Sequence, residues 1–173
     1  DEAPLTAMLA EAGLSRNHFT AVTRTFTTKE FIANQVDVIS AYITDMPFEL
    51  KSKNIAFNII NPHNYGVDFY GDILFTSLEE IQQHPQRVAR FKRASLKGWQ
   101  YALAHPEELV QLIHQQYSSK LSIAHLRYEA EITRKLMLPD IIPIGQLEIP
   151  RLRRIADTYT NIKLAKKLND ADL

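Results

Sequence analysis

The sequence contains no cysteine, and this absence excludes disulfide bonds, thiolate catalysis and zinc sites with cysteine ligands. It also has no charge excess, since 20 lysines and arginines balance 20 aspartates and glutamates. Nucleic-acid-binding proteins usually carry a basic excess, so we expect no nucleic-acid partner. No apolar run approaches the roughly 20 residues of a membrane span, and no signal peptide opens the chain. Any membrane attachment is expected through a segment outside this chain.

Hydrophobic residues make up 45% of the 173 residues, which is enough for a core of ordinary size. Runs rich in valine, isoleucine and threonine predict strands in the first half, with short helical patterns between them. This alternation is typical of a doubly wound parallel sheet, so the predicted fold class is α/β. The strands are expected at His18–Phe26, Val36–Ile43, Ala56–Ile60 and Asp72–Phe75.

Helical patterns dominate the second half of the chain. The His-Pro dipeptides at 84–85 and 105–106 place a proline in a first helical turn, where its missing N–H costs nothing. Pro150 marks a further start in the same way. Ser77 and Glu80 have the spacing of a capping box, in which each side chain satisfies a free backbone N–H of the other.

Several segments resemble a known family. They read QVDVISAY, the crossover YGVDFYGDILFTS, ASLKGW and ALAHPEE, at residues 35–42, 65–77, 94–99 and 102–108. The family they resemble is the type II periplasmic solute-binding class that captures thiamine pyrimidine precursors and alkanesulfonates. The segments 126–131 and 139–144 are similar to a subgroup that forms the sensing region of membrane signalling proteins.

The resemblance implies a fold, a location and a function. Residues 1–75 would form a parallel-sheet lobe of a type II periplasmic-binding-protein-like fold, the second lobe of a two-lobed domain, and 76–173 would be C-terminal helices. It implies a periplasmic or extracytoplasmic protein that binds a small organic solute without catalysis. The protein would act as a sensor region or as a transporter's solute-binding component, with hinge closure around the ligand.

Two alternatives stay open beside solute binding. Fungal relatives that make the thiamine pyrimidine resemble this chain in part, but they rely on a cysteine-rich motif that is missing here. The other alternative is a structural dimerisation module without ligand. Because no nucleophile, base and orienting group can be assembled, we expect no turnover, no metal and no cofactor.

The resemblance leads us to expect that this sequence starts within the second lobe, so that either the chain is a fragment or something else takes the role of the first lobe. The helices that relatives bury partly against it carry apolar side chains, which we expect to pair this fragment as a homodimer. Those side chains are Val88, Phe91, Trp99, Leu126 and Met137.

Candidate ligand-binding residues follow the run Val36–Ile43. Ligands of open α/β sheets bind beyond the carboxyl ends of strands, which here would bring Tyr42, Thr44 and Asp45 to the site. An aromatic ring can stack on a ligand ring, and a carboxylate can accept hydrogen bonds from ring amines. The alternative is that Thr44 or Asp45 merely caps the next helix.

A second group of candidates lies in the crossover. The polar residues there can line a cleft, or they can belong to an ordinary hinge loop. These candidates are Asn61, Tyr65, Asp68, Tyr70 and Asp72.

Overall fold

The computed structural model describes residues 2–23, 25 and 27–167. The secondary structure in these ranges is helical. The helices are α1 (Glu2–Glu11), η1 (Arg16–His18), α2 (Lys29–Ile32), α3 (Met46–Ser52), η2 (Pro62–Tyr65), α4 (Leu78–Gln83), α5 (Pro85–Ala104), α6 (Pro106–Gln116), α7 (Ile123–Met137) and α8 (Ile149–Asn161).

The α/β fold class predicted from the sequence is wrong, because the described ranges contain no strand and hence no parallel-sheet lobe. The run Val36–Ile43 has no regular secondary structure and ends in a turn. Ala56–Ile60 and Asp72–Phe75 are also irregular. In the first predicted strand, His18–Phe26, His18 belongs to η1 and residues 19–23 are irregular, whereas Arg24 and Phe26 lie outside the described residues.

The reason is that β propensity depends on context. Valine and isoleucine favour a strand when neighbouring strands bond to its backbone and cover its side chains. Here the side chains expected inside a sheet are open to solvent: Val38 is 67% exposed, Ile59 53% and Ile60 55%. The apolar content of these runs therefore predicted strands, but in the described residues no neighbouring strand pairs with them.

The chain forms two compact units. Unit 1 consists of Asp1–Thr25, Phe57–Ile73 and Leu147–Leu173, and unit 2 consists of Phe26–Ala56 and Leu74–Gln146. The predicted division into residues 1–75 and 76–173 concerned the lobes of a binding domain and stays a prediction.

In unit 1, α1 packs against η2 and α8. The ring of Phe69 stacks on that of Tyr159 in α8, with 5.4 Å between the ring centroids. Gly66 ends η2 with a φ of 75°, a conformation that glycine adopts without strain. Buried and partly buried apolar residues form the core of this unit: Ala7, Met8, Val67, Phe69 and Ile162.

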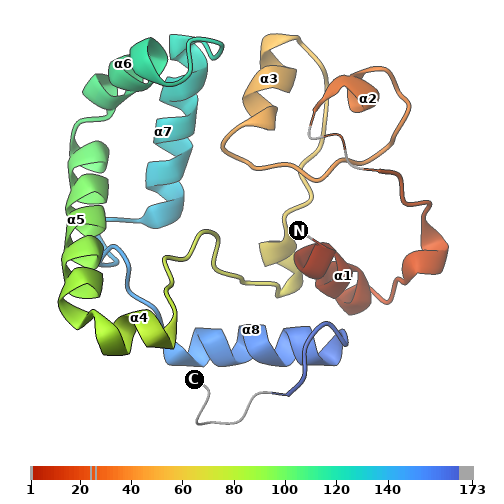
Figure 1. Ribbon diagram of the computed structural model, residues 1–173. Helices are drawn as coiled ribbons and strands as arrows, with labels where there is room; N and C mark the ends of the chain where they lie inside the picture. The colour runs from red at the N-terminus through yellow and green to blue at the C-terminus, as the bar shows by residue number, and fades with distance from the viewer. Residues whose placement is uncertain (1, 24, 26, 168–173) are drawn as a thin grey trace. The chain divides into compact units, whose positions relative to one another are not determined.

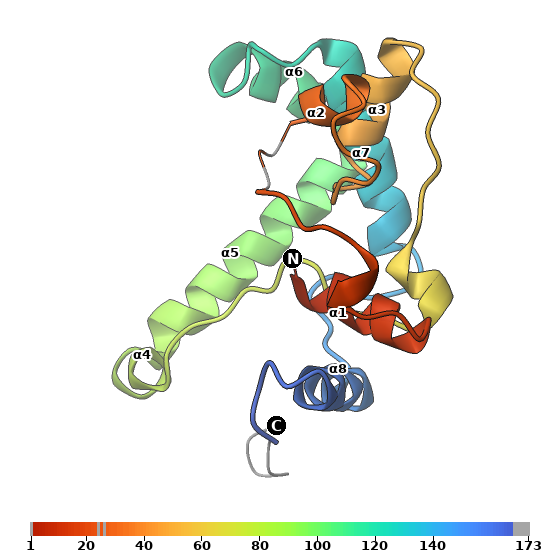
Figure 2. The ribbon, with the colours of Figure 1, turned by 90° about the vertical axis from the view of Figure 1, so that its right-hand side faces the viewer.

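In unit 2, α6 connects the end of α5 to the start of α7 and packs against both (Figure 1). Helix α3 packs on α7, and α4 packs on α5 at the start of that long helix (Figure 2). A two-pronged ion pair reinforces the contact of α6 with α7: Arg127 Nε and Nη2 lie 2.8 and 2.6 Å from the carboxylate oxygens of Glu107. The buried apolar side chains of this unit include Met46, Leu50, Leu103, Val110 and Leu126.

The helix starts predicted from local signals are confirmed. Pro85, Pro106 and Pro150 each occupy a first helical turn. The Ser77 hydroxyl accepts a hydrogen bond of 3.1 Å from the backbone N–H of Glu80, which caps α4 and confirms one half of the predicted capping box. The Glu80 carboxylate instead accepts hydrogen bonds from Arg87. These signals succeed because they depend only on neighbouring residues.

The apolar side chains predicted to face a partner differ in exposure. Phe91 and Trp99 in α5 are 62% and 47% exposed, so both side chains are accessible to a partner. Leu126 is only 4% exposed, so it belongs to the interior of unit 2.

Candidate functional site

The crossover residues Asp68 and Tyr70 meet at one arginine. The guanidinium of Arg151 in α8 lies 2.5 Å from Asp68 Oδ1, and its carbon lies 4.0 Å from the centroid of the Tyr70 ring. The Tyr70 hydroxyl accepts a hydrogen bond of 2.8 Å from the backbone N–H of Glu148, which precedes α8. His63 Nε2 lies 2.9 Å from Asp68 Oδ1.

This cluster holds the crossover against α8. The Asp68 carboxylate lies between two basic groups, and the Tyr70 ring covers the guanidinium in a cation–π contact. Arg151 holds this cluster together because it contacts both Asp68 and Tyr70. Sequence reasoning missed Arg151 because it lies 83 positions from Asp68. The geometry favours the structural interpretation of Asp68 and Tyr70.

The remaining crossover candidates do not join this cluster. The Asn61 side chain accepts a hydrogen bond of 3.1 Å from the His63 backbone N–H and so caps η2. Tyr65 is 43% exposed, and Asp72 lies exposed in a bend. Tyr65 and Asp72 therefore present side chains that solvent reaches.

In unit 2, Tyr42, Thr44 and Asp45 lie at the turn before α3. The Tyr42 ring is 62% exposed, and its backbone carbonyl accepts the Asp45 N–H at 3.1 Å. Asp45 occupies the N-cap position of α3, but its side chain makes no capping hydrogen bond. Instead, Asp45 Oδ1 lies 2.9 Å from Nε2 of His125 in α7.

The His125 ring stacks on Phe48 of α3 with 4.7 Å between centroids. One turn further along α7, burial raises the pKa of the Glu129 carboxyl, and the Asp45 charge raises it further, while His125 opposes the shift. A buried acid beside another acid binds a proton more readily. Sequence reasoning did not find this group, since the residues come together only where α3 packs on α7.

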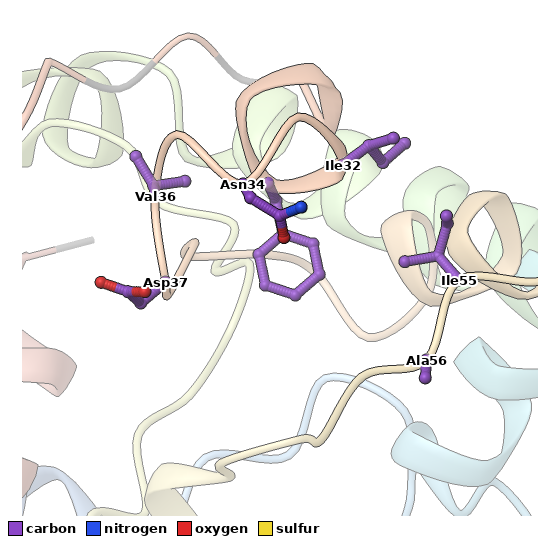
Figure 3. Close-up of a pocket in the computed structure, with 7 residues that line it drawn as sticks. Ile32, Asn34, Val36, Asp37, Ile55 and Ala56 are labelled. Atoms are coloured by element: carbon purple, nitrogen blue, oxygen red, sulfur yellow. The ribbon is translucent and has the colours of Figure 1, made fainter.

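A cavity of about 310 Å³ opens elsewhere in unit 2. Its apolar wall includes Phe31, Ile32 and Ile55, and its polar groups are Asn34 and Asp37. In Figure 3, Asp37 lies on one side and Ile55 on the other, with Asn34 between them. Sequence analysis did not single out these residues, although Asp37 belongs to the QVDVISAY segment.

Within the described ranges, no three histidine, aspartate or glutamate side chains come together in a way that could hold a metal ion. None of the helices in those ranges combines the length and the apolar character needed to cross a bilayer.

The chain belongs to the NMT1/THI5-like family, whose model matches residues 1–109. The matched range contains both groups of predicted site residues and the cavity. Searches of curated proteins and of solved structures give no match.

Family membership confirms the solute-binding class predicted from the sequence. The family is compatible with binding of small ligands, most members are solute-binding proteins, and some are synthases. Its members are generally periplasmic or extracytoplasmic. The segments 126–131 and 139–144, which indicated the sensor-associated subgroup, lie outside the matched range, so the subgroup stays a prediction.

Proposed function

We propose that this chain contributes to non-catalytic binding of a small organic solute, in a periplasmic or extracytoplasmic setting. The observation that carries the proposal is the family match over residues 1–109. Within that range the chain has a cavity of about 310 Å³, which is near the lower end of the volumes of small-molecule sites.

Among the predicted site residues, we propose that the solvent-accessible ones contact the solute, each within its own unit. In unit 2 this residue is Tyr42, whose ring is exposed. In unit 1 the accessible candidates are the Tyr65 ring and the Asp72 carboxylate. Thr44, Asp45, Asn61, Asp68 and Tyr70 would contribute by shaping the surrounding turns. Tyr42→Ala would then weaken solute affinity by roughly fivefold or more, because a stacked ring contributes about 1 kcal/mol or more.

The experiment is a thermal-shift screen of the purified chain against small solutes of positive, neutral and negative charge, followed by titration calorimetry of each hit. A ligand that binds only the native state raises the melting temperature with concentration. Mass spectrometry of each hit after prolonged incubation separates binding from synthesis, because a binding protein returns its ligand unchanged. If no solute of any charge binds, this function is wrong.

We further propose that the chain works as the sensing region of a signalling protein or as a transporter's solute-binding component, and that it self-associates. Exposed apolar side chains in α4, in α5 and in the segment just before α4 provide a surface for a second copy: Phe75 is 87% exposed, Leu78 75% and Phe91 62%. Sedimentation of the wild type at micromolar concentration, beside a Leu78→Glu and Phe91→Glu double variant, tests the dimer. A monomeric wild type would contradict it.

A further inference from the structure

The walls of the cavity in unit 2 begin at two similar turns. After α2, Asn34 adopts a φ of 53°, and the Gln35 N–H donates to the Glu30 carbonyl at 2.8 Å. After α3, Asn54 adopts a φ of 56°, and the Ile55 N–H donates to the Leu50 carbonyl at 3.0 Å. Both are helix ends closed by a left-handed asparagine and a bond across five residues.

These turns determine which side chains line the cavity. The first reverses the chain so that Phe31 of α2 and Asp37, six residues later, line the same cavity. The second starts the opposite wall at Ile55 (Figure 3). Because the hydrogen bonds hold both turns, the wall residues are positioned before any ligand arrives.

Asp37 is the only charged side chain among the residues that line this cavity. It lies in the described part of the chain, where no cation forms an ion pair with it and no donor forms a hydrogen bond with its carboxylate. Other carboxylates of unit 2 have partners within the protein: Glu107 binds Arg127, and Asp45 lies against His125. The charge of Asp37 therefore remains available to a ligand.

The rest of the lining favours an apolar ligand body. Phe31, Ile32 and Ile55 are partly buried and offer a ring and two aliphatic side chains. An aromatic face attracts a cation, and an apolar wall stabilises the hydrocarbon part of the same ligand. The Asn34 amide adds one donor and one acceptor group. An anionic solute would face the Asp37 carboxylate with no lysine or arginine in the lining to offset it.

We propose that this cavity binds a small organic ammonium ion, with Asp37 as its counter-charge and Phe31 against its apolar body. The inference rests on the proposed solute-binding function and names the chemical class of the solute. It also assigns to Asp37 the role that the sequence analysis gave to Asp45: an acid beside an aromatic ring near the run 36–43.

The test uses benzylammonium as a probe, with benzyl alcohol and benzoate as neutral and anionic counterparts of similar size. Titration of the ¹⁵N-labelled chain is followed by amide shifts. We expect benzylammonium to shift the amides of residues 31–37 and 55–56, and we expect weaker binding of the alcohol and none of benzoate.

The variant Asp37→Asn keeps the shape of the side chain and removes its charge. We expect it to weaken benzylammonium binding by about tenfold or more, since a charge-assisted hydrogen bond is lost. Binding of benzyl alcohol should change by less than about twofold. Asp157→Asn, on an exposed position of α8, is the matched control and should leave both affinities unchanged. Equal melting temperatures of the variants and the wild type would show that folding is intact.

The outcomes separate this inference from the function on which it rests. If benzylammonium binds equally well to Asp37→Asn, or shifts amides outside the cavity, the proposed site is wrong. If neutral or anionic solutes from the screen bind while ammonium probes do not, the ligand class is wrong and solute binding stands. If no solute of any charge binds, both proposals fail.

Discussion

Nε2 of His125 lies 2.9 Å from Oδ1 of Asp45, and this contact joins the turn before α3 to α7. The His125 side chain is 11% exposed, whereas that of Asp45 is 49% exposed. One partner of the pair is therefore largely buried, and the other is exposed to solvent. A residue predicted to contact ligand thus contributes to the packing of two helices.

Asp45→Asn should lower the free energy of unfolding of unit 2 by about 0.5–1 kcal/mol, because the amide keeps the shape but loses the charge of a partly exposed pair. Urea unfolding followed by circular dichroism measures the change, with Asp157→Asn as the control. A loss of solute affinity with unchanged stability would instead favour the ligand-binding role.

Glu107→Gln should lower the melting temperature at pH 7. The Arg127 guanidinium, with further help from Gln111, holds the pKa of Glu107 at about 2, below its ordinary value of 4.5. A carboxyl whose pKa is lowered by folding stabilises the protein above its unfolded pKa and loses this effect as the pH falls through the folded pKa. The difference between wild type and variant should therefore be largest above pH 4.5 and disappear by about pH 2.

The matched control for this pair is Arg127→Gln. In that background, Glu107→Gln should add little pH-dependent loss, because the guanidinium that lowers the pKa is already absent. Melting curves of the four proteins between pH 2 and pH 7 give the comparison. An equally large effect of Glu107→Gln in both backgrounds would mean that Arg127 is not its partner.

Leu126→Ala should lower the free energy of unfolding by about 2–5 kcal/mol, since Leu126 is 4% exposed and its truncation leaves a cavity in unit 2. The control is Leu136→Ala on the same helix. Leu136 is 61% exposed, so this substitution should change the free energy of unfolding by no more than about 0.5 kcal/mol. Denaturant unfolding of both variants measures the two losses. An equal loss of unfolding free energy at the two positions would contradict the packing of α7.

Two glycines of unit 2 should respond to alanine with opposite signs. Gly145 has a φ of 81°, and an added Cβ would lie 2.7 Å from Leu96 Cδ2, so Gly145→Ala should cost about 1–2 kcal/mol. Gly98 lies within α5, and beyond the helix's own nearby backbone and its two chain neighbours no atom lies within 4 Å of an added Cβ, so Gly98→Ala should stabilise the protein by about 0.5–1 kcal/mol. Thermal unfolding of both variants tests the pair, and a stabilised Gly145→Ala would contradict the backbone conformation of that turn.

Local patterns predicted some elements well. The His-Pro helix starts at 84–85 and 105–106 and the cap at Ser77 are confirmed, because a helix end is satisfied by residues within one turn of it. The same reasoning predicted a strand at Val36–Ile43 and was wrong there. A strand needs a neighbour that its own residues cannot supply.

The sequence by itself determined the family, the absence of cysteine chemistry and most helix starts, since these depend on residue identity and short-range spacing. Only the tertiary structure decided which acids pair with which bases. Asp68 meets Arg151 83 positions away, whereas Asp37 meets no protein cation among the described residues. Pairing through space depends on how helices pack, and the spacing of residues along the chain does not contain that information.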